Sequence, residues 1–179
     1  MTKDALISAI KNHTSEYEEE INFKPRFIEL LEDSNCFLRS RLEGHLTASC
    51  WVTNQSNEKV LLLHHKKLDR WLQPGGHADG DENLIHVAEK ELNEETGLEN
   101  FTLSSNKIFD IDIHLIPEKK GIPEHFHFDV RFHFIAENPN EIQKNHESLD
   151  LKWVNLADIS KLCNDEMSVM RMVNKSKKL

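Results

Sequence analysis

A glycine-rich loop that runs straight into a helix is the feature that most constrains the fold of this 179-residue chain. The loop PGGHADGDE spans residues 74–82, and its three glycines tolerate positive φ and let the backbone approach a ligand closely. The pattern that follows predicts a helix from Asn83 to Thr96, with Asp81 as N-cap and Gly97 as a left-handed stop. The expected buried stripe of this helix consists of Ile85, Ala88 and Leu92.

The predicted helix carries an unusual concentration of carboxylates. In EKELNEE, residues 89–95, the side chains of Glu91, Glu94 and Glu95 share one helical face. Unit charges about 6 Å apart repel by roughly 3 kcal/mol at an effective dielectric constant of about 20. A bound divalent cation such as Mg²⁺ would turn that cost into a gain, since Mg²⁺ prefers carboxylate oxygens. A solvated acidic face explains the run equally simply, but the adjoining glycine loop favours the cation.

The loop and the helix together resemble a known motif. Residues 76–98, GHADGDENLIHVAEKELNEETGL, are similar to the Nudix box, G-x5-E-x7-R-E-U-x-E-E-x-G-U, in which U is aliphatic. Lys90 stands where the family has arginine. The other eight of the nine defined positions match, namely Gly76, Glu82, Glu91, Leu92, Glu94, Glu95, Gly97 and Leu98.

The resemblance implies a Nudix hydrolase of the α/β class, an α/β/α sandwich around a mixed β-sheet that cleaves nucleoside diphosphates linked to another group. Further similarity is expected from His45 to Leu162, because W-x-x-P-G-G-H and LKWVNLADI also resemble family positions. We therefore expect an N-terminal helical extension over residues 1–40 and a Nudix hydrolase domain over residues 41–179. The extension either caps the sheet or forms a homodimer interface.

The resemblance also implies a site for Mg²⁺ or Mn²⁺. Glu91 and Glu95 would be the principal ligands, and Glu94 would support a ligand or a metal-bound water. The carbonyl of Gly75 or Gly76 would add an oxygen, and Glu82 would be an accessory ligand or an anchor of the box. The metal would neutralise diphosphate oxygens and activate a water that attacks phosphorus.

Four other residues bear on catalysis or substrate binding. The family's arginine is implied to orient a catalytic glutamate, and lysine at position 90 keeps its positive charge but lacks its bidentate geometry, so either the activity is lower or another residue has the orienting role. Glu141 and Glu147 lie ahead of the last strand, where Nudix enzymes often carry a base; Glu147 is our candidate, and a solvated loop carboxylate is the alternative. Trp71 either stacks a nucleobase or belongs to the core.

An alternating segment, HFHFDVRFHF at residues 125–134, places histidines and Arg131 on one strand face and phenylalanines on the other. Arg131 is the candidate contact for substrate phosphate. His125 and His127 are candidates for substrate binding or for a transition metal. His77, beside Gly76, is the other histidine expected to touch a ligand. The alternative for each histidine is a place on a covered or solvated sheet face.

The rest of the chain mixes helices and strands. The first 40 residues read as two helices, with Pro25 in the first turn of the second. Residues 45–54 and 59–65 form a predicted β-hairpin, and KIFDIDIHLIP at 107–117 a strand with one polar side. A loop follows at 118–124, then a short strand at LKWV, then a helical region from Ala157 to about Lys175. This mixture predicts an α/β or α+β fold.

The composition limits which substrates and cellular locations are expected for this protein. A net charge of −9 leaves no broad basic field for nucleic-acid backbones, so we expect a small phosphorylated substrate, in most cases a nucleotide. The longest aliphatic run is VLLL at 60–63 and the N-terminus lacks the apolar core of a signal peptide, so a cytoplasmic protein without membrane contact is expected. The three scattered cysteines predict neither disulfides nor a zinc site.

Two functions from different classes are consistent with these residues. The first is a metal-dependent pyrophosphohydrolase. The second is a catalytically weak Nudix domain that senses a nucleotide or metabolite, suggested by Lys90. An isopentenyl diphosphate isomerase shares the fold but is the weakest alternative, because no matching catalytic cysteine motif is present.

Overall fold

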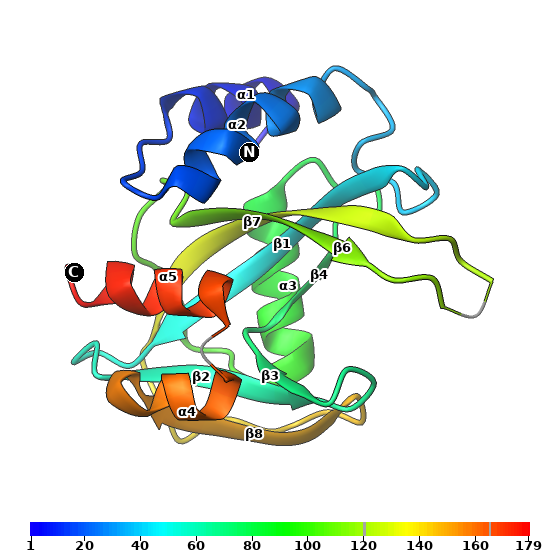
Figure 1. Ribbon diagram of the computed structural model, residues 1–179. Coiled ribbons are helices and arrows are strands. Elements are labelled where there is room, and N and C mark those ends of the chain that lie inside the picture. The colour runs from blue at the N-terminus through cyan, green and yellow to red at the C-terminus, as the bar shows by residue number, and fades with distance from the viewer. Residues whose placement is uncertain (120, 165) are drawn as a thin grey trace. The chain divides into compact units, whose positions relative to one another are not determined.

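The computed structural model describes residues 1–119, 121–164 and 166–179 (Figure 1). It mixes helices and strands, as the sequence predicts. In chain order they are α1 (Lys3–Asn12), α2 (Glu18–Leu30), β1 (Gly44–Thr53), β2 (Lys59–His65), β3 (Arg70–Leu72), β4 (Gly75–His77), α3 (Leu84–Thr96), β5 (Phe101–Leu103), β6 (Asp110–Ile116), β7 (His125–Ala136), β8 (Ser148–Asn155), the 3₁₀ turn η1 (Leu156–Asp158), α4 (Ile159–Cys163) and α5 (Met167–Ser176).

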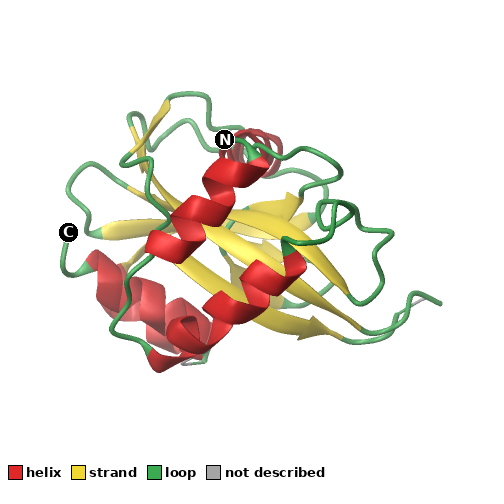
Figure 2. Ribbon diagram, turned by 90° about the horizontal axis from the view of Figure 1, so that it is seen from above, coloured by secondary structure: helices red, strands yellow, loops and turns green. Residues whose placement is uncertain are grey.

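The described chain divides into two compact units. The first comprises Met1–Ser49, Gly76–Ala88 and Lys107–Phe132, and the second comprises Cys50–Gly75, Glu89–Asn106 and His133–Leu179. The strands form a mixed sheet, drawn in yellow in Figure 2. All ten residues of β1 are buried, so both faces of the sheet are covered there and the alternation of a half-exposed strand is absent.

In the first unit, β6 and β7 form a long antiparallel pair in which Asp110 lies opposite Arg131 and Ile116 opposite His125. Helix α2 packs on β6, and the ring of Phe27 meets that of Phe128 edge to face at 5.3 Å. The fully buried carboxylate of Glu20 accepts the backbone N–H of Ile111 at 3.0 Å. Because a buried carboxylate needs such donors, this bond fixes α2 to β6.

The same Glu20 carboxylate also fixes the segment between the two N-terminal helices. His13 Nε2 lies 2.8 Å from Glu20 Oε1, and the hydroxyl of Ser15 donates to Glu20 Oε2. The two helices thus belong to the core of the first unit. The division of the chain at residue 40 stays a prediction.

In the second unit, β2 pairs antiparallel with β1, β3 and β8, and β5 pairs with the end of β7. Helix α4 packs on β3, and the indole N–H of Trp51 on β1 donates to Ser176 Oγ on α5 at 2.6 Å. These contacts attach the C-terminal helices to the strands of this unit. None of the helices described in either unit is both long and apolar enough to cross a membrane.

Several predicted elements are confirmed. The β-hairpin forms, with Thr53 opposite Val60, and the predicted helix at 83–96 is α3. Gly97 has the left-handed φ of 67° expected of a helix stop, and its N–H donates to Asn93 O at 2.8 Å. The cap at the other end differs: α3 begins at Leu84, the Asn83 side chain accepts the N–H of His86, and Asp81 accepts the N–H of Asn83.

Three other predictions need correction. Pro25 lies inside α2 rather than in its first turn, because the helix begins at Glu18 with an acidic first turn that favours its N-terminus. The predicted C-terminal helical region is divided, since Asn164 caps α4 in a left-handed conformation. Asp165 in that region and Lys120 in the predicted loop at 118–124 lie outside the described residues. The polar side of β6 is buried rather than solvated at Asp110 and Asp112.

That buried side is organised by Arg131 of β7, whose side chain is 3% exposed. The Arg131 guanidinium lies 2.8 Å from Asp129, 3.1 Å from Asp110 and 3.2 Å from Asp112. Burial alone would lower the pKa of Arg131, but the three carboxylates raise it above its ordinary value. Every described contact of this guanidinium is to a carboxylate, and the role of Arg131 as a phosphate contact stays a prediction.

We expect Arg131→Met to lower the free energy of unfolding by about 3–5 kcal/mol, because it leaves buried aspartates without their cation. Urea unfolding followed by circular dichroism measures the loss. Arg70→Met is the matched control, since Arg70 is exposed. Equal stability of the two variants would show that the network contributes nothing.

We expect Gly97→Ala to destabilise the protein by about 1 kcal/mol or more. Alanine is strained at a φ of 67°, and its Cβ would lie 3.1 Å from the Cβ of Gln143. Gly121→Ala separates the two causes, because Gly121 has a φ of 79° with nothing within 4 Å of an added Cβ. The same unfolding measurement should therefore give a larger loss at position 97; a larger loss at position 121 would contradict this account.

Candidate active site

Glu95 is the buried carboxylate of α3. Its residue is 8% exposed, and its Oε2 accepts the backbone N–H of Gly75 at 2.9 Å. Gly75 begins β4, within the loop that the sequence predicts to approach a ligand. This hydrogen bond holds the last turns of the helix against the loop, and it does so through residues that both belong to the second unit.

Three further carboxylates act on Glu95. Burial raises the pKa of Glu95 to about 7, the Gly75 N–H opposes that rise, and the negative charges of Glu91, Glu147 and Glu94 add to it. Four carboxylates are therefore close enough to interact in the second unit, three from α3 and one from the loop before β8. A cation bound among these carboxylates would offset both the cost of burying the Glu95 charge and the repulsion between the four charges.

The three helical carboxylates differ in exposure. Glu91 is half-buried, whereas the side chain of Glu94 is 56% exposed. Lys90 Nζ lies 3.9 Å from Glu94 Oε1, and the Lys90 side chain is 58% exposed. A pair of this kind stabilises a helix by only a few tenths of a kcal/mol. Lys90 thus contacts Glu94 as a single exposed charge, without the two-point geometry of a guanidinium.

Glu147 reaches this group through an anchored loop. The backbone N–H of Gln143 donates to Thr96 O at 2.6 Å, and the Asn145 side chain donates to Glu94 O at 3.3 Å. Asn145 also accepts the backbone N–H of Glu147 at 2.9 Å. The loop is thus fixed to the end of α3, which explains how Glu147 comes to act on Glu95 across fifty residues of sequence.

Trp71 is half-buried in the same unit. Its ring stacks on that of His64, with centroids 5.0 Å apart and planes inclined by 15°. Lys152 Nζ lies 4.4 Å from the centroid of the Trp71 ring. The indole is therefore already supported by two side chains, and its predicted role in stacking a base stays a prediction.

Other predicted residues lie in the first unit. Glu82 is exposed, and its Oε2 accepts the backbone N–H of Lys3 at 3.3 Å. Gly76 is half-buried in β4. The contributions of Glu82 and of the Gly76 carbonyl to a metal site stay predictions.

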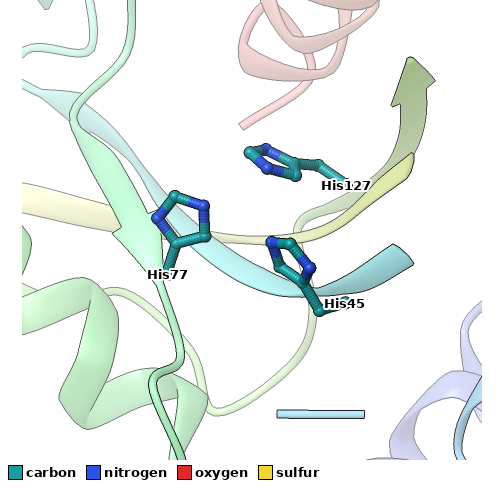
Figure 3. A group of neighbouring side chains, drawn as sticks. All are labelled: His45, His77 and His127. Carbon is teal, nitrogen blue, oxygen red and sulfur yellow. The ribbon is translucent and has the colours of Figure 1, made fainter. Parts of the chain in front are cut away.

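The predicted histidines also gather in the first unit, together with His45. The rings of His77, His125 and His127 each lie within 5.2 Å of another ring of the group. Figure 3 shows the rings of His45, His77 and His127 turned toward one another. Strand periodicity places His125 and His127 on one face, but no sequence signal joins them to His45 and His77, which come from β1 and β4.

In protein stripped of divalent ions, we expect Glu95→Gln to gain stability relative to wild type as pH rises from about 5 to about 8. The folded pKa of Glu95 is about 7, above the ordinary 4.5, so its stabilising proton is fully present below about pH 4.5 and is lost as pH rises through about 7. Comparison with the variant is needed because burial lowers the pKa of His127 to about 2 and that of His133 to about 4, and these groups raise the stability of both proteins over the same range. The expected relative gain is on the order of 2–3 kcal/mol. Urea unfolding in EDTA at both pH values measures it, with Glu89→Gln as control. A difference between wild type and Glu95→Gln that does not change with pH would contradict the assignment.

Comparison with solved structures shows a shared fold. The chain is similar to a Caenorhabditis elegans Ap4A hydrolase in a binary complex (TM-score 0.59, 23% identity, covering 74% of this chain and 95% of that one). It is similar to a NUDIX family hydrolase from Clostridium perfringens (TM-score 0.59, 24% identity, covering 75% of this chain and 97% of that one). It is also similar to a MutT protein from Methanosarcina mazei (TM-score 0.61, 18% identity, covering 77% of this chain and 96% of that one). These matches support the α/β/α sandwich predicted from the sequence.

Among curated proteins, none matches the chain closely enough to count as a relative. A family model does match: the model described as NUDIX domain aligns with residues 43–172, most of the chain. Members of this family generally use divalent metal ions. The protein therefore belongs to the NUDIX family and is a hydrolase acting on acid anhydrides.

Proposed function

We propose that this hydrolase cleaves the diphosphate linkage of a nucleoside diphosphate derivative, or of a similar small phosphorylated substrate, with the help of Mg²⁺ or Mn²⁺. The observation that carries the proposal is the group of four interacting carboxylates around buried Glu95, beside the backbone of Gly75. We also propose that the NUDIX domain spans residues 41–179 and that residues 1–40 form an N-terminal extension.

The donor set fits a hard divalent cation. Glu91 and Glu95 are proposed as the principal ligands, with Glu94 beside them and the Gly75 carbonyl as a further oxygen. Carboxylate and carbonyl oxygens are the ligands that Mg²⁺ and Mn²⁺ take in proteins. When bound, such a cation neutralises charge on the diphosphate and lowers the pKa of a coordinated water. The raised pKa of Glu95 supports this assignment, since burial and the neighbouring carboxylates both oppose its negative charge and a bound cation would offset both.

Glu147 is proposed as the general base. Its side chain is 40% exposed, so a water or a substrate can reach it, and Lys67 Nζ lies 3.5 Å from its Oε1. A base must come within about 3 Å of the proton that it removes, directly or through one water. The anchored loop provides the fixed position that such a role requires.

The substrate class follows from charge and size. A net charge of −9 disfavours long polyanions, whereas a small diphosphate can be neutralised by a few cations at one site. A dinucleoside polyphosphate is one member of the class, because the similar C. elegans protein is an Ap4A hydrolase. His77, His125, His127 and Trp71 are kept as the residues proposed to contact the substrate.

The test is a substrate panel with Mg²⁺ or Mn²⁺ that contains nucleoside triphosphates, nucleotide sugars, ADP-ribose, dinucleoside polyphosphates and capped RNA. We expect turnover of at least one compound, and a fall in kcat of about 100-fold or more in Glu91→Gln and in Glu95→Gln. Glu89→Gln is the control, because Glu89 lies on the same helix outside the motif. Glu147→Gln should lower kcat with little change in KM.

Unchanged turnover in both Glu91→Gln and Glu95→Gln would contradict the assignment of these residues as metal ligands. A second function is favoured by one observation, the exposed single contact of Lys90 with Glu94. If the protein binds nucleotides tightly without turning over any compound, and Lys90→Arg gains activity, the chain is a weak catalyst used as a nucleotide or metabolite sensor.

A further inference from the structure

We propose that His45, His77 and His127 form a binding site for a divalent transition-metal ion of the zinc class. The three residues differ from all the carboxylates assigned above, and all three belong to the first unit. The site therefore uses none of the proposed Mg²⁺ ligands, although His77 and His127 are also proposed to contact the substrate.

The geometry of the three side chains suits one ion. Each offers a ring nitrogen, and the three nitrogens lie within 4.8 Å of one another. The ring centroids form a nearly regular triangle with sides of 5.1, 5.0 and 4.9 Å (Figure 3). Tetrahedral zinc with Zn–N of about 2.0–2.1 Å needs nitrogens roughly 3.4 Å apart. Binding therefore requires the side chains to turn so that the nitrogens approach one another by up to about 1.4 Å.

The tautomer of His45 prepares it as a ligand. Its Nδ1 lies 3.1 Å from the backbone carbonyl of Arg41. A carbonyl only accepts, so Nδ1 carries the proton and Nε2 carries the lone pair. A backbone carbonyl that orients a histidine in this way is the usual outer partner of a metal-bound imidazole.

Two buried nitrogens have unused bonding capacity. Nε2 of His45 and Nε2 of His127 are buried and have no hydrogen-bond partner among residues 1–119, 121–164 and 166–179. Leaving a buried polar atom unsatisfied costs about 1–3 kcal/mol. Two such atoms in one cluster point to a ligand that accepts their lone pairs.

The charge state favours a cation over a phosphate. Burial lowers the pKa of His127 to about 2, and it lowers the pKa of His45 as well. Both rings are neutral at physiological pH, as metal ligands must be. A neutral ring whose Nδ1–H is bonded to a carbonyl offers a lone pair, which repels phosphate oxygens and attracts a metal.

The chemistry of the donors selects the ion. Imidazole suits Zn²⁺, Cu²⁺, Ni²⁺ and Fe²⁺, whereas Mg²⁺ prefers oxygen. Three histidines leave a fourth position. His125 is the nearest further candidate, since its ring lies 5.1 Å from that of His45 and its Nδ1 donates to Pro123 O at 2.8 Å, which leaves Nε2 for a metal.

The experiment is equilibrium dialysis of the chelator-stripped full chain against zinc in a large excess of Mg²⁺, with metal counted per chain. We expect one zinc per chain, and a loss of affinity above about 100-fold in each of His45→Ala, His77→Ala and His127→Ala, more than the loss of a residue that only orients a ligand typically causes. His146→Ala is the control, because that side chain is 91% exposed. Glu91→Gln should keep its zinc, which separates this site from the hydrolytic one.

A second measurement needs no variant. Wild-type protein loaded with Co²⁺ should show the intense visible bands of a four-coordinate ion with nitrogen ligands. A pale six-coordinate spectrum would overturn the proposal. So would zinc binding well below one ion per chain, or zinc retained at wild-type affinity by the three histidine variants when circular dichroism shows them folded.

Discussion

The hydrogen bond from the Gly75 amide to the Glu95 carboxylate is the interaction on which the candidate active site depends. It allows an acid to be buried at the end of α3, and it fixes the helix to the loop that precedes it. Without a donor, burying that carboxylate would cost several kcal/mol, and the acid would turn to solvent or stay protonated. One donor offsets only part of that cost, so burial still raises the pKa of Glu95 to about 7 and the site favours a cation.

Two clusters of buried polar side chains in the first unit differ in how their polar groups are paired. Around Arg131, opposite charges are paired, and every described contact of the guanidinium is to a carboxylate. Around His45, the groups are neutral and two nitrogens have no partner in the described chain. The first arrangement stabilises the fold. The second leaves buried nitrogens able to bind a ligand, which is why the zinc-class site is inferred there.

Much of the local structure could be predicted because it depends on neighbours in sequence. The hairpin at 45–65, the C-terminal end of α3 and the left-handed Gly97 follow from turn residues, hydrophobic spacing and capping. The errors arise where burial overrides pattern. Alternation in β6 predicts a wet polar side, but Asp110 and Asp112 are buried because Arg131 pairs with them across the strand pair. Periodicity reports which residues share a face and does not report what covers that face.

The sequence by itself determined the family motif, the α/β class and the identity of the carboxylates, because spacing along one loop and helix fixes them. Only the tertiary structure decided that Glu95 is buried while Glu94 is exposed, that the loop carrying Glu147 reaches them, and that His45 and His77 join His127. The physical reason is that desolvation and charge interaction depend on distances between segments far apart in the chain, which no local pattern contains.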